Sequence, residues 1–534
     1  MGRSKAVCFC VLASSMFLAA CQTSSQARPT STPTLADIPI PATATVIPSI
    51  WFSPAVPDSL RQIVAGSGME RVATPDATTA SLDVSSPQPA SDNFSSTVWI
   101  YALVTPFPTA ADGVSLLDIQ HTWNGSPSGP FAGRLLRMDQ ATLAAFCAAW
   151  GNPAAGGVQV GRADQLVDLA WAGRPAWAII PFEALEPRWK VLSVDGQSPI
   201  HNDFDPDSYP LKISFSLQPA LYRLPPSNRD PHKLTVLAMT GTTALVRATA
   251  DRMEKNGMLY PGEQIDRVLR SADITHISNE VSFDANCPKP DPWTLSLFFC
   301  SNPRYIALLE DAGTDVVELT GNHLLDSGQA NFLTTLDMYD RLGWKYYGGG
   351  QDLQDALQPA LVENNGNKLA FIGCDFPGPP SDWATVNSPG AAPCHLDRMV
   401  LEISQLRSKG YLPIMTFQYQ EYYQPNPTYE EKADFRKMAE AGALIVSGSQ
   451  AHEPASIEIL NGAFVHYGLG NLFFDQMFSL ATRDSFVDRH VFYNGKYIDT
   501  ELLTYIIEDF AQPRSMTELE RTQFLEKMFK LAGW

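Results

Sequence analysis

Apolar residues fall in short runs that alternate with segments of helical periodicity. In the first half of the chain, strand-like runs come at 98–104, 176–180 and 190–194, and helix-like segments at 141–150 and 165–171. In the second half, β-branched apolar runs end in polar residues at 234–239, 274–277, 315–319, 413–417 and 444–446. Strands that alternate with helices predict an α/β fold, and polar side chains at strand ends are where such folds assemble sites.

Local signals predict hairpins and a terminal helix. Asn-Gly pairs lie between strand-like runs at Asn365-Gly366, Asn461-Gly462 and Asn494-Gly495. In the tail, Ser515 and Glu518 have the spacing of a capping box, and apolar residues follow at helical spacing. We therefore expect a C-terminal helix within residues 513–534.

The first residues have the pattern of an export signal. Arg3 and Lys5 precede an apolar stretch, 6–20, that is shorter than a membrane span. The stretch ends in Leu-Ala-Ala-Cys21, which resembles the lipobox of bacterial lipoproteins. That resemblance implies cleavage before Cys21 and acylation of this cysteine, so that the exported protein is lipid-anchored at the outer face of the cell membrane. The alternative is an ordinary signal peptide with a chance cysteine.

Composition divides the remaining chain. Residues 21–50 are rich in Thr, Ser, Pro and Ala, as expected of a tether that follows the signal peptide, 1–20. Prolines in 224–233 disfavour both helix and sheet. We therefore expect one domain at 51–225 and a second at 234–512, followed by the terminal helix.

The balance of charge excludes some partners. The chain of 534 residues has 38 Lys and Arg against 57 Asp and Glu, a formal charge of −19. Such a protein repels phosphate backbones and anionic lipid surfaces, so we expect no nucleic-acid binding and no electrostatic membrane attachment. Hydrophobic residues make up 45% of the chain, enough for packed cores.

Export also changes what the cysteines predict. In an oxidising compartment, the local pairs Cys287–Cys300 and Cys374–Cys394 are expected to form disulfides. Cys147 would then be free and buried.

Three segments of the first domain, 104–109, 114–125 and 180–196, resemble periplasmic solute-binding proteins of the phosphate-binding type. The resemblance implies a solute-binding-like α/β domain with a ligand crevice near residues 105–109. The alternative is that these residues are turns and caps of a domain that binds nothing.

The second domain carries five short motifs in order: Ser278-Asn279-Glu280, 319–328 (LTGNHLLDSG), 347–350 (YGGG), Glu421-Tyr422 and 466–475 (HYGLGNLFFD). This ordered set resembles the CapA/PgsA family, which is associated with capsule and poly-γ-glutamate synthesis and is similar to calcineurin-like metallophosphoesterases. The resemblance implies a two-sheet sandwich flanked by helices.

The resemblance also assigns candidate site residues. Glu280, Asn322 and His452 stand at metal-ligand positions, and His323 stands where the family has its catalytic histidine. Asp326 is placed to orient the His323 imidazole. The alternative for Asp326 is a favourable charge at a helix N-terminus.

Departures from the family pattern weaken the metal site. Thr242 replaces a carboxylate, and Phe417 and Gln450 replace histidines. Because a two-metal site needs hard oxygen and imidazole ligands, we expect no dinuclear centre. One divalent ion such as Mn²⁺, and no metal at all, both stay open.

Amide, hydroxyl and charged groups near the same motifs suit a carboxylate, amide or sugar polymer. The candidate ligand-binding residues are Thr242, Arg247, Gln418, Gln420, Glu421 and Gln450.

The leading hypothesis is a membrane-anchored accessory protein that makes or handles an envelope polymer and has an incomplete phosphoesterase site. Its partners would be the membrane, through the lipid anchor, and the polymer or its synthesis machinery. Two alternatives are an active metal-dependent hydrolase on the same scaffold and a solute-capture lipoprotein. The sequence leaves open whether the chain is an enzyme.

Overall fold

The computed structural model describes residues 48–85 and 93–534, and the chain from Pro48 to Trp534 forms one compact unit. The predicted signal peptide, Cys21 and most of the predicted tether lie outside the described residues. The first strand begins at Ser49, inside the range predicted for the tether. The division into domains at 51–225 and 234–512 stays a prediction.

The strands between residues 49 and 218 form one sheet, in the order β2-β1-β3-β10-β4-β8-β6-β7, with β9 and β5 attached beside β4. Their bounds are β1 Ser49–Phe52, β2 Glu70–Arg71, β3 Ala80–Val84, β4 Ser95–Pro106, β5 Gly113–Val114, β6 Leu136–Met138, β7 Val158–Val160, β8 Trp177–Pro181, β9 Trp189–Val194 and β10 Lys212–Gln218. The helices of this part are α1 Asp58–Ala65, α2 Leu116–Trp123, α3 Gln140–Trp150 and α4 Leu166–Ala172.

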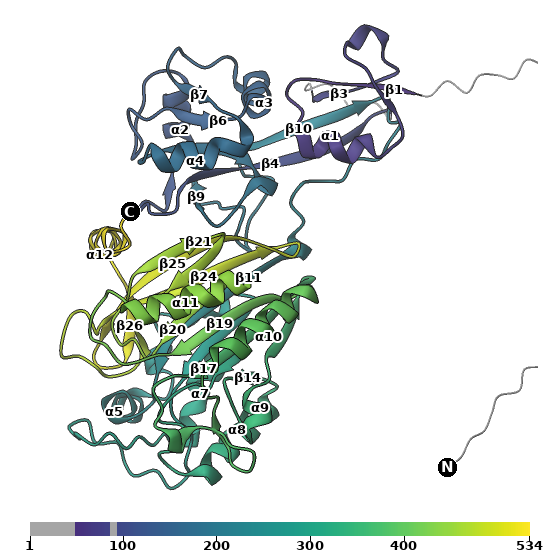
Figure 1. Cartoon of the computed structure of the whole chain (residues 1–534). Helices are drawn as coiled ribbons and strands as arrows, with labels where there is room; N and C mark the ends of the chain where they lie inside the picture. Colours follow the sequence, from purple (N-terminus) through teal and green to yellow (C-terminus); the bar gives the residue numbers. More distant parts are fainter. Residues whose placement is uncertain (1–47, 86–92) are drawn as a thin grey trace, which may run out of the picture. The chain divides into compact units, whose positions relative to one another are not determined.

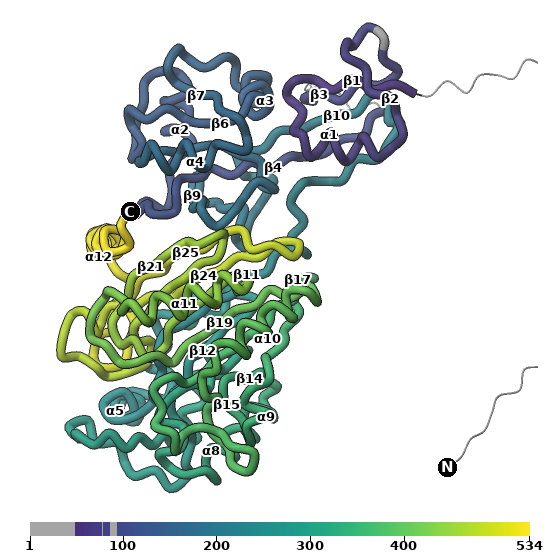
Figure 2. The backbone as a smooth tube through the Cα atoms, in the orientation of Figure 1, coloured from purple at the N-terminus to yellow at the C-terminus, as the bar shows by residue number. Residues whose placement is uncertain are grey.

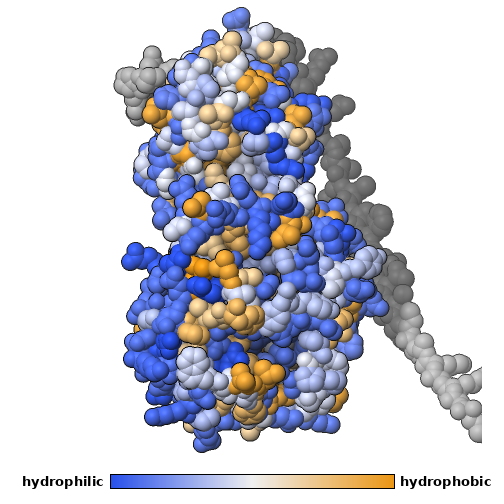
Figure 3. Space-filling view, turned by 90° about the vertical axis from the view of Figure 1, so that its left-hand side faces the viewer, coloured by the Kyte–Doolittle hydropathy of each residue, from blue (hydrophilic) through white to orange (hydrophobic). Residues whose placement is uncertain are grey.

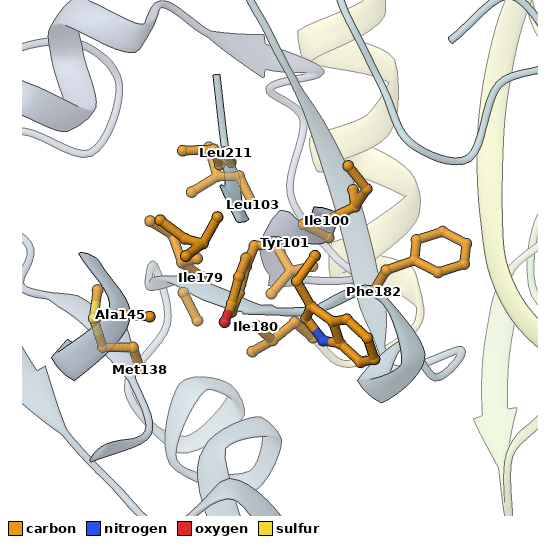
Figure 4. Packing of buried hydrophobic residues seen from close by; sticks show 14 of the residues in the cluster. Ile100, Tyr101, Leu103, Met138, Ala145, Ile179, Ile180, Phe182 and Leu211 are labelled. Atoms are coloured by element: carbon orange, nitrogen blue, oxygen red, sulfur yellow. The ribbon is translucent and has the colours of Figure 1, made fainter. Parts of the chain in front are cut away.

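The long strand β4 is the centre of this part. Its residues Ile100, Tyr101 and Leu103 are buried and pack against Ile179 and Ile180 of β8. Figure 4 shows these side chains around the Tyr101 ring. The predicted strands and helices of this region are all present. Continuous apolar runs and helical spacing are local signals, and both place apolar side chains where the core can bury them.

From Leu234 onward the chain forms two further large sheets. One has the order β14-β13-β12-β11-β24-β25-β26, with β23 beside β11, and the other the order β16-β17-β19-β20-β22-β21. The strands of the first are β11 Leu234–Thr243, β12 Ile274–Asn279, β13 Thr314–Glu318, β14 Lys345–Tyr347, β23 Asn471–Phe473, β24 Asp484–Tyr493, β25 Lys496–Glu508 and β26 Gln512–Ser515. Those of the second are β16 Ala360–Asn364, β17 Asn367–Asp375, β19 Leu412–Gln418, β20 Ile445–Ser449, β21 Ile457–Leu460 and β22 Ala463–His466; β15 Gly349–Gly350 pairs with β18 Gly390–Ala391.

Helices flank these two sheets, and the C-terminal one joins the core that includes Phe107 and Phe371. Their bounds are α5 Arg247–Asn256, α6 Asp266–Arg270, α7 Ile306–Asp311, α8 Gln329–Leu342, α9 Leu353–Ala356, α10 Leu396–Ser408, α11 Tyr429–Ala441 and α12 Glu518–Leu531. In Figure 1, α10 and α11 lie across the sheet of β17, β19 and β20, and the trace in Figure 2 shows the same layering.

Alternation along the strands explains the layers. In β11, Leu237 and Met239 face the other sheet and share a core with Phe371 and Ile414, whereas Ala238 between them joins a separate core under the helices. Because successive side chains of a strand point to opposite faces, each strand contributes to two cores. The predicted two-sheet sandwich flanked by helices, an α/β fold, is therefore what the structure has.

The three Asn-Gly hairpins form as predicted, whereas the predicted capping box does not. Each Asn-Gly pair forms a hairpin turn, between β16 and β17, β21 and β22, and β24 and β25, with positive φ at the asparagine. The predicted capping box at Ser515 and Glu518 is wrong, since Ser515 belongs to β26. Thr517 caps α12 instead and exchanges hydrogen bonds with Glu520.

Both expected disulfides, Cys287–Cys300 and Cys374–Cys394, are formed. Cys147 is free, as expected, but it is only partly buried. Within residues 48–85 and 93–534, none of the helices combines the length and apolar character needed to cross a bilayer.

Candidate functional site

Polar side chains from both sheets of the sandwich meet where parallel strands end. Thr242 is the next-to-last residue of β11, Glu280 follows β12, and Asn322 follows β13. Gln418 ends β19 in the opposite sheet, and His452 follows β20. Strands β11, β12 and β13 are parallel, as are β19 and β20, so their carboxyl ends come together at one edge of each sheet.

Gln418 is the centre of this cluster. Its Nε2 donates hydrogen bonds to Glu280 Oε1 at 3.0 Å and to Asn322 Oδ1 at 3.2 Å. Its Oε1 accepts a hydrogen bond from Ser449 Oγ at 3.1 Å. Gln418 is fully buried and Glu280 almost so. A single amide therefore ties together two of the three expected metal ligands.

Phe417, expected to stand in place of a family histidine, does not reach the polar cluster. Phe417 is buried in the core under α11, where its ring stacks on Phe435 at 4.7 Å between centroids. Side chains of β19 alternate, so the next residue, Gln418, is the one that faces the polar cluster. Of these two neighbours, only Gln418 contributes to the cluster.

His323 lies beside Asp326 and against the ring of Phe299. Its Nδ1 is 2.8 Å from Asp326 Oδ2. The centroids of the His323 and Phe299 rings are 4.1 Å apart. Burial alone would lower the pKa of His323, but the hydrogen bond with Asp326 and the negative charges of Glu280 and Asp382 raise it overall. The imidazole thus keeps its proton to a higher pH than a free histidine does.

Asp326 has the orienting contact that was expected, but not the alternative role. Helix α8 has Gly328 as its N-cap, so Asp326 precedes the helix rather than lying in its first turn. Its Oδ2 instead accepts a hydrogen bond from the backbone N–H of Phe299 at 2.7 Å in addition to the contact with His323.

His452 is buried and held by Asn471. Its Nδ1 is 2.7 Å from Asn471 Oδ1, an oxygen that can only accept, so Nδ1 carries the proton. The other ring nitrogen, Nε2, is 3.8 Å from a carboxylate oxygen of Glu421. Glu421 is 41% exposed, so this edge of the cluster reaches solvent.

Arg247 is committed to an ion pair. Its guanidinium forms a bidentate pair with the buried carboxylate of Asp475, which also accepts the N–H of Ala248 at 2.8 Å. The guanidinium lies 4.8 Å from the centroid of the Phe299 ring and 4.9 Å from that of Phe474. Because Asp475 neutralises Arg247, this arginine is a poor docking point for an anionic polymer.

Two expected ligand-binding residues are buried with unpartnered polar atoms. Thr242 Oγ1 and Gln450 Oε1 have no hydrogen-bond partner in the described part of the chain, although Thr242 is only 1% and Gln450 only 3% exposed. Buried polar atoms normally find partners, so these two mark where a water or ligand atom can bind. By contrast, Gln420 is exposed.

Further carboxylates belong to the surroundings of the site and were missed. Burial raises the pKa of Asp375, at the end of β17, to about 7, with a contribution from the charge of Asp382. Burial and the charge of Asp326 raise the pKa of Asp382 to about 6. Asp375 follows an apolar run, the same signal that marked the other strand ends. Asp382 ends a short 3-10 helix, Pro380–Asp382, and has no such signal.

The donor set does not fit a divalent metal centre. Within residues 48–85 and 93–534, no three His, Cys, Asp or Glu side chains are grouped so that they could hold a metal ion. The N–H groups of Gln418 point at the oxygens of Glu280 and Asn322 that a cation would need. A bound divalent ion would face these hydrogens instead of a lone pair.

The segment at residues 105–109, where a ligand crevice was predicted, is packed against the rest of the chain. Thr105 is fully buried and donates to the carbonyl of Ala176 at 2.8 Å, and the ring of Phe107 packs edge-on against Phe529 and Trp534. The hollow beside Phe107 and Thr109 measures about 10 Å³, too small for a solute. The C-terminal helix fills the space.

A larger hollow of about 940 Å³ lies elsewhere in the first part of the chain. Residues from β1, α1, α3 and the segments after β7 and β8 line it, among them Phe52, Arg61, Asp139, Arg162 and Glu183. Its charged groups are engaged with one another or with the backbone: Arg162 pairs with Asp164, and Arg61 donates to carbonyl groups.

Residues 236–476 match the model of a family described as bacterial capsule synthesis protein PGA_cap. This part of the chain is similar to the CapA/PgsA family. Its match with the PGA biosynthesis protein CapA of Bacillus subtilis (strain 168) has 24% identity over 236 residues, 44% of this chain and 61% of that protein. The capsule biosynthesis protein CapA of Bacillus anthracis is 24% identical over 282 residues, 51% of this chain and 68% of that protein. The chain thus spans about three fifths of the B. subtilis CapA.

Among solved structures, the NAD nucleotidase (NadN) of Haemophilus influenzae is similar, with 11% identity, 56% of each chain covered and a TM-score of 0.32. A score this low carries no argument about the CapA-like part. The resemblance of the first part of the chain to solute-binding proteins stays a prediction.

Proposed function

We propose that this chain is an accessory protein for the synthesis or handling of a cell-envelope polymer of the capsule or poly-γ-glutamate class, and that it acts without a dinuclear metal centre. Similarity to the CapA/PgsA family supports the polymer class. The hydrogen bonds from Gln418 to Glu280 and Asn322 support the absence of phosphoesterase chemistry, because a neutral amide lies where a metal-binding site would need another ligand.

We also propose that the protein is exported and anchored through acylated Cys21. The two disulfides of the described residues support an oxidising compartment. The formal charge of −19 makes a lipid anchor a better means of attachment than electrostatic attraction to anionic lipids.

The charges around the polar cluster limit what it holds. Asp326, Asp382 and Glu280 surround His323, while Arg247 is neutralised by its partner. A polyanion would be repelled here, so we propose that the cluster takes a neutral, amide-bearing or hydroxyl-bearing part of the polymer, or of the machinery that makes it. Thr242 and Gln450 would supply the unpartnered polar atoms.

Two measurements test the accessory role. Protein purified without chelator should contain far less than one metal ion per chain and should not hydrolyse a generic phosphodiester with added Mn²⁺. In the source organism, loss of the gene should lower cell-bound polymer, and a Glu280→Gln allele should restore it. Stoichiometric metal together with Mn²⁺-dependent hydrolysis that Glu280→Gln abolishes would instead establish the hydrolase.

Capture of a small solute by the first part of the chain is a second candidate, favoured by the cavity of about 940 Å³. A screen of anions, amino acids and sugars against the full chain should find a compound that raises its melting temperature. Arg162→Ala should reduce that shift. If none of the compounds raises the melting temperature, solute capture is ruled out as a function.

A further inference from the structure

An apolar loop projects beside the candidate site. It consists of residues 287–300, between β12 and α7, and the Cys287–Cys300 disulfide closes it with Cα atoms 5.6 Å apart. Leu295 is 95% exposed, Trp293 80%, Leu297 72% and Phe298 59%. Side chains this exposed contact almost nothing of their own protein. Figure 3 shows apolar surface at the lower end of the molecule, the end that carries α5 and α8 in Figure 1.

We propose that this loop inserts its tip into the acyl region of a lipid bilayer. Residues 292–300 contain no charged side chain, in a chain of which 18% of residues are charged. Four large apolar side chains on one loop are far more than the scattered single residues that protein surfaces normally expose. Tryptophan and leucine are the residue types that bind membrane interfaces, with the amphipathic indole at headgroup level.

The backbone of the loop favours a bilayer over a protein partner. The N–H of Trp293 donates to Asp291 Oδ1 at 3.0 Å, that of Ser296 to Thr294 Oγ1 at 3.2 Å, and that of Phe298 to Ser296 Oγ at 3.1 Å. A segment that pairs with the edge of another protein's sheet keeps these donors free for its partner. Here they are satisfied inside the loop, which lowers the cost of moving the backbone out of water.

The base of the loop is fixed to the candidate site. Phe299 donates its N–H to Asp326 and lies against His323, while the tip residues just before it stay exposed. Across the site, Phe478 is 69% exposed and packs at 5.4 Å against Tyr423, whose ring lies near His452. Exposed apolar side chains thus flank the polar cluster on both sides.

Insertion would present the site to the membrane surface. The cluster would then act on material held at that surface, such as a growing polymer or a membrane-bound part of its machinery. This consequence rests on the proposed function, whereas the insertion itself does not.

Quenching by brominated phosphatidylcholine vesicles tests the insertion. The probe is the full chain with Cys21→Ala, so that no acyl chain is attached; the first tryptophan after this position is Trp51, so tryptophan emission does not report on the signal segment. Lipid brominated in its acyl chains should quench part of the emission, and Trp293→Phe should remove most of that quenching. Because residues 292–300 carry no charge, the quenching should be the same at low and high salt.

A matched pair of variants separates insertion of the loop from non-specific adsorption of exposed leucines to the vesicles. Leu295→Ser/Leu297→Ser should lower the quenching at least about tenfold, since two buried leucines are lost from the inserted tip. Leu401→Ser/Leu519→Ser removes leucines that are 63% and 67% exposed from α10 and α12 and should change nothing. Circular dichroism checks that each variant is folded.

Two outcomes would overturn the proposal. One is equal quenching in the Cys21→Ala protein and its Trp293→Phe variant. The other is a dimer that forms without vesicles and is lost in Leu295→Ser/Leu297→Ser, which would make the loop a contact between protein chains. Neither result bears on metal content or polymer yield, so failure here is distinct from failure of the proposed function.

Discussion

The side-chain amide of Gln418 donates a hydrogen bond of 3.0 Å to the carboxylate of Glu280, and both residues are buried. Burial raises the pKa of Glu280, although the nearby imidazoles of His452 and His323 oppose that shift. A buried carboxyl group that a neutral amide already satisfies needs no cation. The contact thus satisfies the buried carboxyl group of Glu280 within the protein itself.

Gln418→His should introduce a metal ligand. The substitution replaces an amide donor with an imidazole nitrogen beside Glu280 and Asn322, near enough for the three to share a divalent ion. We expect the affinity for Mn²⁺ or Zn²⁺, measured by calorimetry, to rise at least about tenfold over the unmodified protein, a gain of about 1.4 kcal/mol.

Gln420→His is the matched control, because Gln420 is exposed and is separated from the cluster by one residue of chain. It should leave metal affinity unchanged. Equal gains for both variants would mean that surface imidazoles, not the cluster, bind the ion. Tight binding by the unmodified protein would show that Gln418 yields its place to a metal.

Asp475→Ala should destabilise the protein by about 3–5 kcal/mol, because it leaves the Arg247 guanidinium unpaired between Phe299 and Phe474. The side chain of Asp475 is 6% exposed and that of Arg247 is 18% exposed. Urea unfolding measures the loss. The pair Arg162–Asp164 is the control, since its side chains are 73% and 63% exposed. Asp164→Ala should leave the urea midpoint nearly unchanged; a similar loss in both variants would contradict the structural role given to Asp475.

Local patterns were enough to predict most of the fold. The Asn-Gly pair at Asn461 forms its hairpin because two adjacent residues decide the turn, and the apolar run at 413–417 forms a strand because its length and β-branched content suit nothing else. Thr517 caps α12 in place of Ser515, because Ser515 belongs to β26 and pairs with β25. Tertiary pairing outweighs a cap that is worth about 1 kcal/mol.

The candidate site was harder to predict, for two physical reasons. First, a motif gives residues by position, whereas strand alternation decides which side chain faces the site; of the neighbours Phe417 and Gln418, only Gln418 faces it. Second, Asp382 joins the surroundings of His323 through a short 3-10 helix, Pro380–Asp382, in a proline-rich segment whose sequence has no apolar periodicity. The pair of His323 and Asp326 was predictable because the two are close in sequence.

Asp375 should make stability fall as pH rises. Burial raises the pKa of this carboxyl group to about 7 in the folded protein, against an ordinary value near 3.8. Below about pH 4 both states are protonated. Between that pH and about 7 the unfolded chain loses the proton while the folded protein keeps it, which costs stability by at most about 1.4 kcal/mol per pH unit. Asp375→Asn removes this contribution, so its stability relative to the unmodified protein should rise from pH 4 to 7 in urea titrations.

Asp203→Asn is the control for this titration, since the side chain of Asp203 is 94% exposed. It should leave the pH dependence of unfolding unchanged. A parallel course of the Asp375→Asn and unmodified curves over this range would show that Asp375 is ionised in the folded protein.

Leu525→Ala should show that the terminal helix belongs to the core of the sandwich. Leu525 is fully buried and shares a core with Phe107 of the first part of the chain and Phe371 of β17, so its truncation leaves a cavity. The expected cost is about 2–5 kcal/mol, measured as a lower midpoint of thermal or urea unfolding.

Leu519, in the first turn of the same helix, is 67% exposed, and Leu519→Ala should cost less than about 0.5 kcal/mol. If α12 only lay on the surface, both substitutions would have the same small effect. A large loss for Leu525→Ala alone would mean that the tail is needed to close the space beside Phe107, where a solute had been expected to bind.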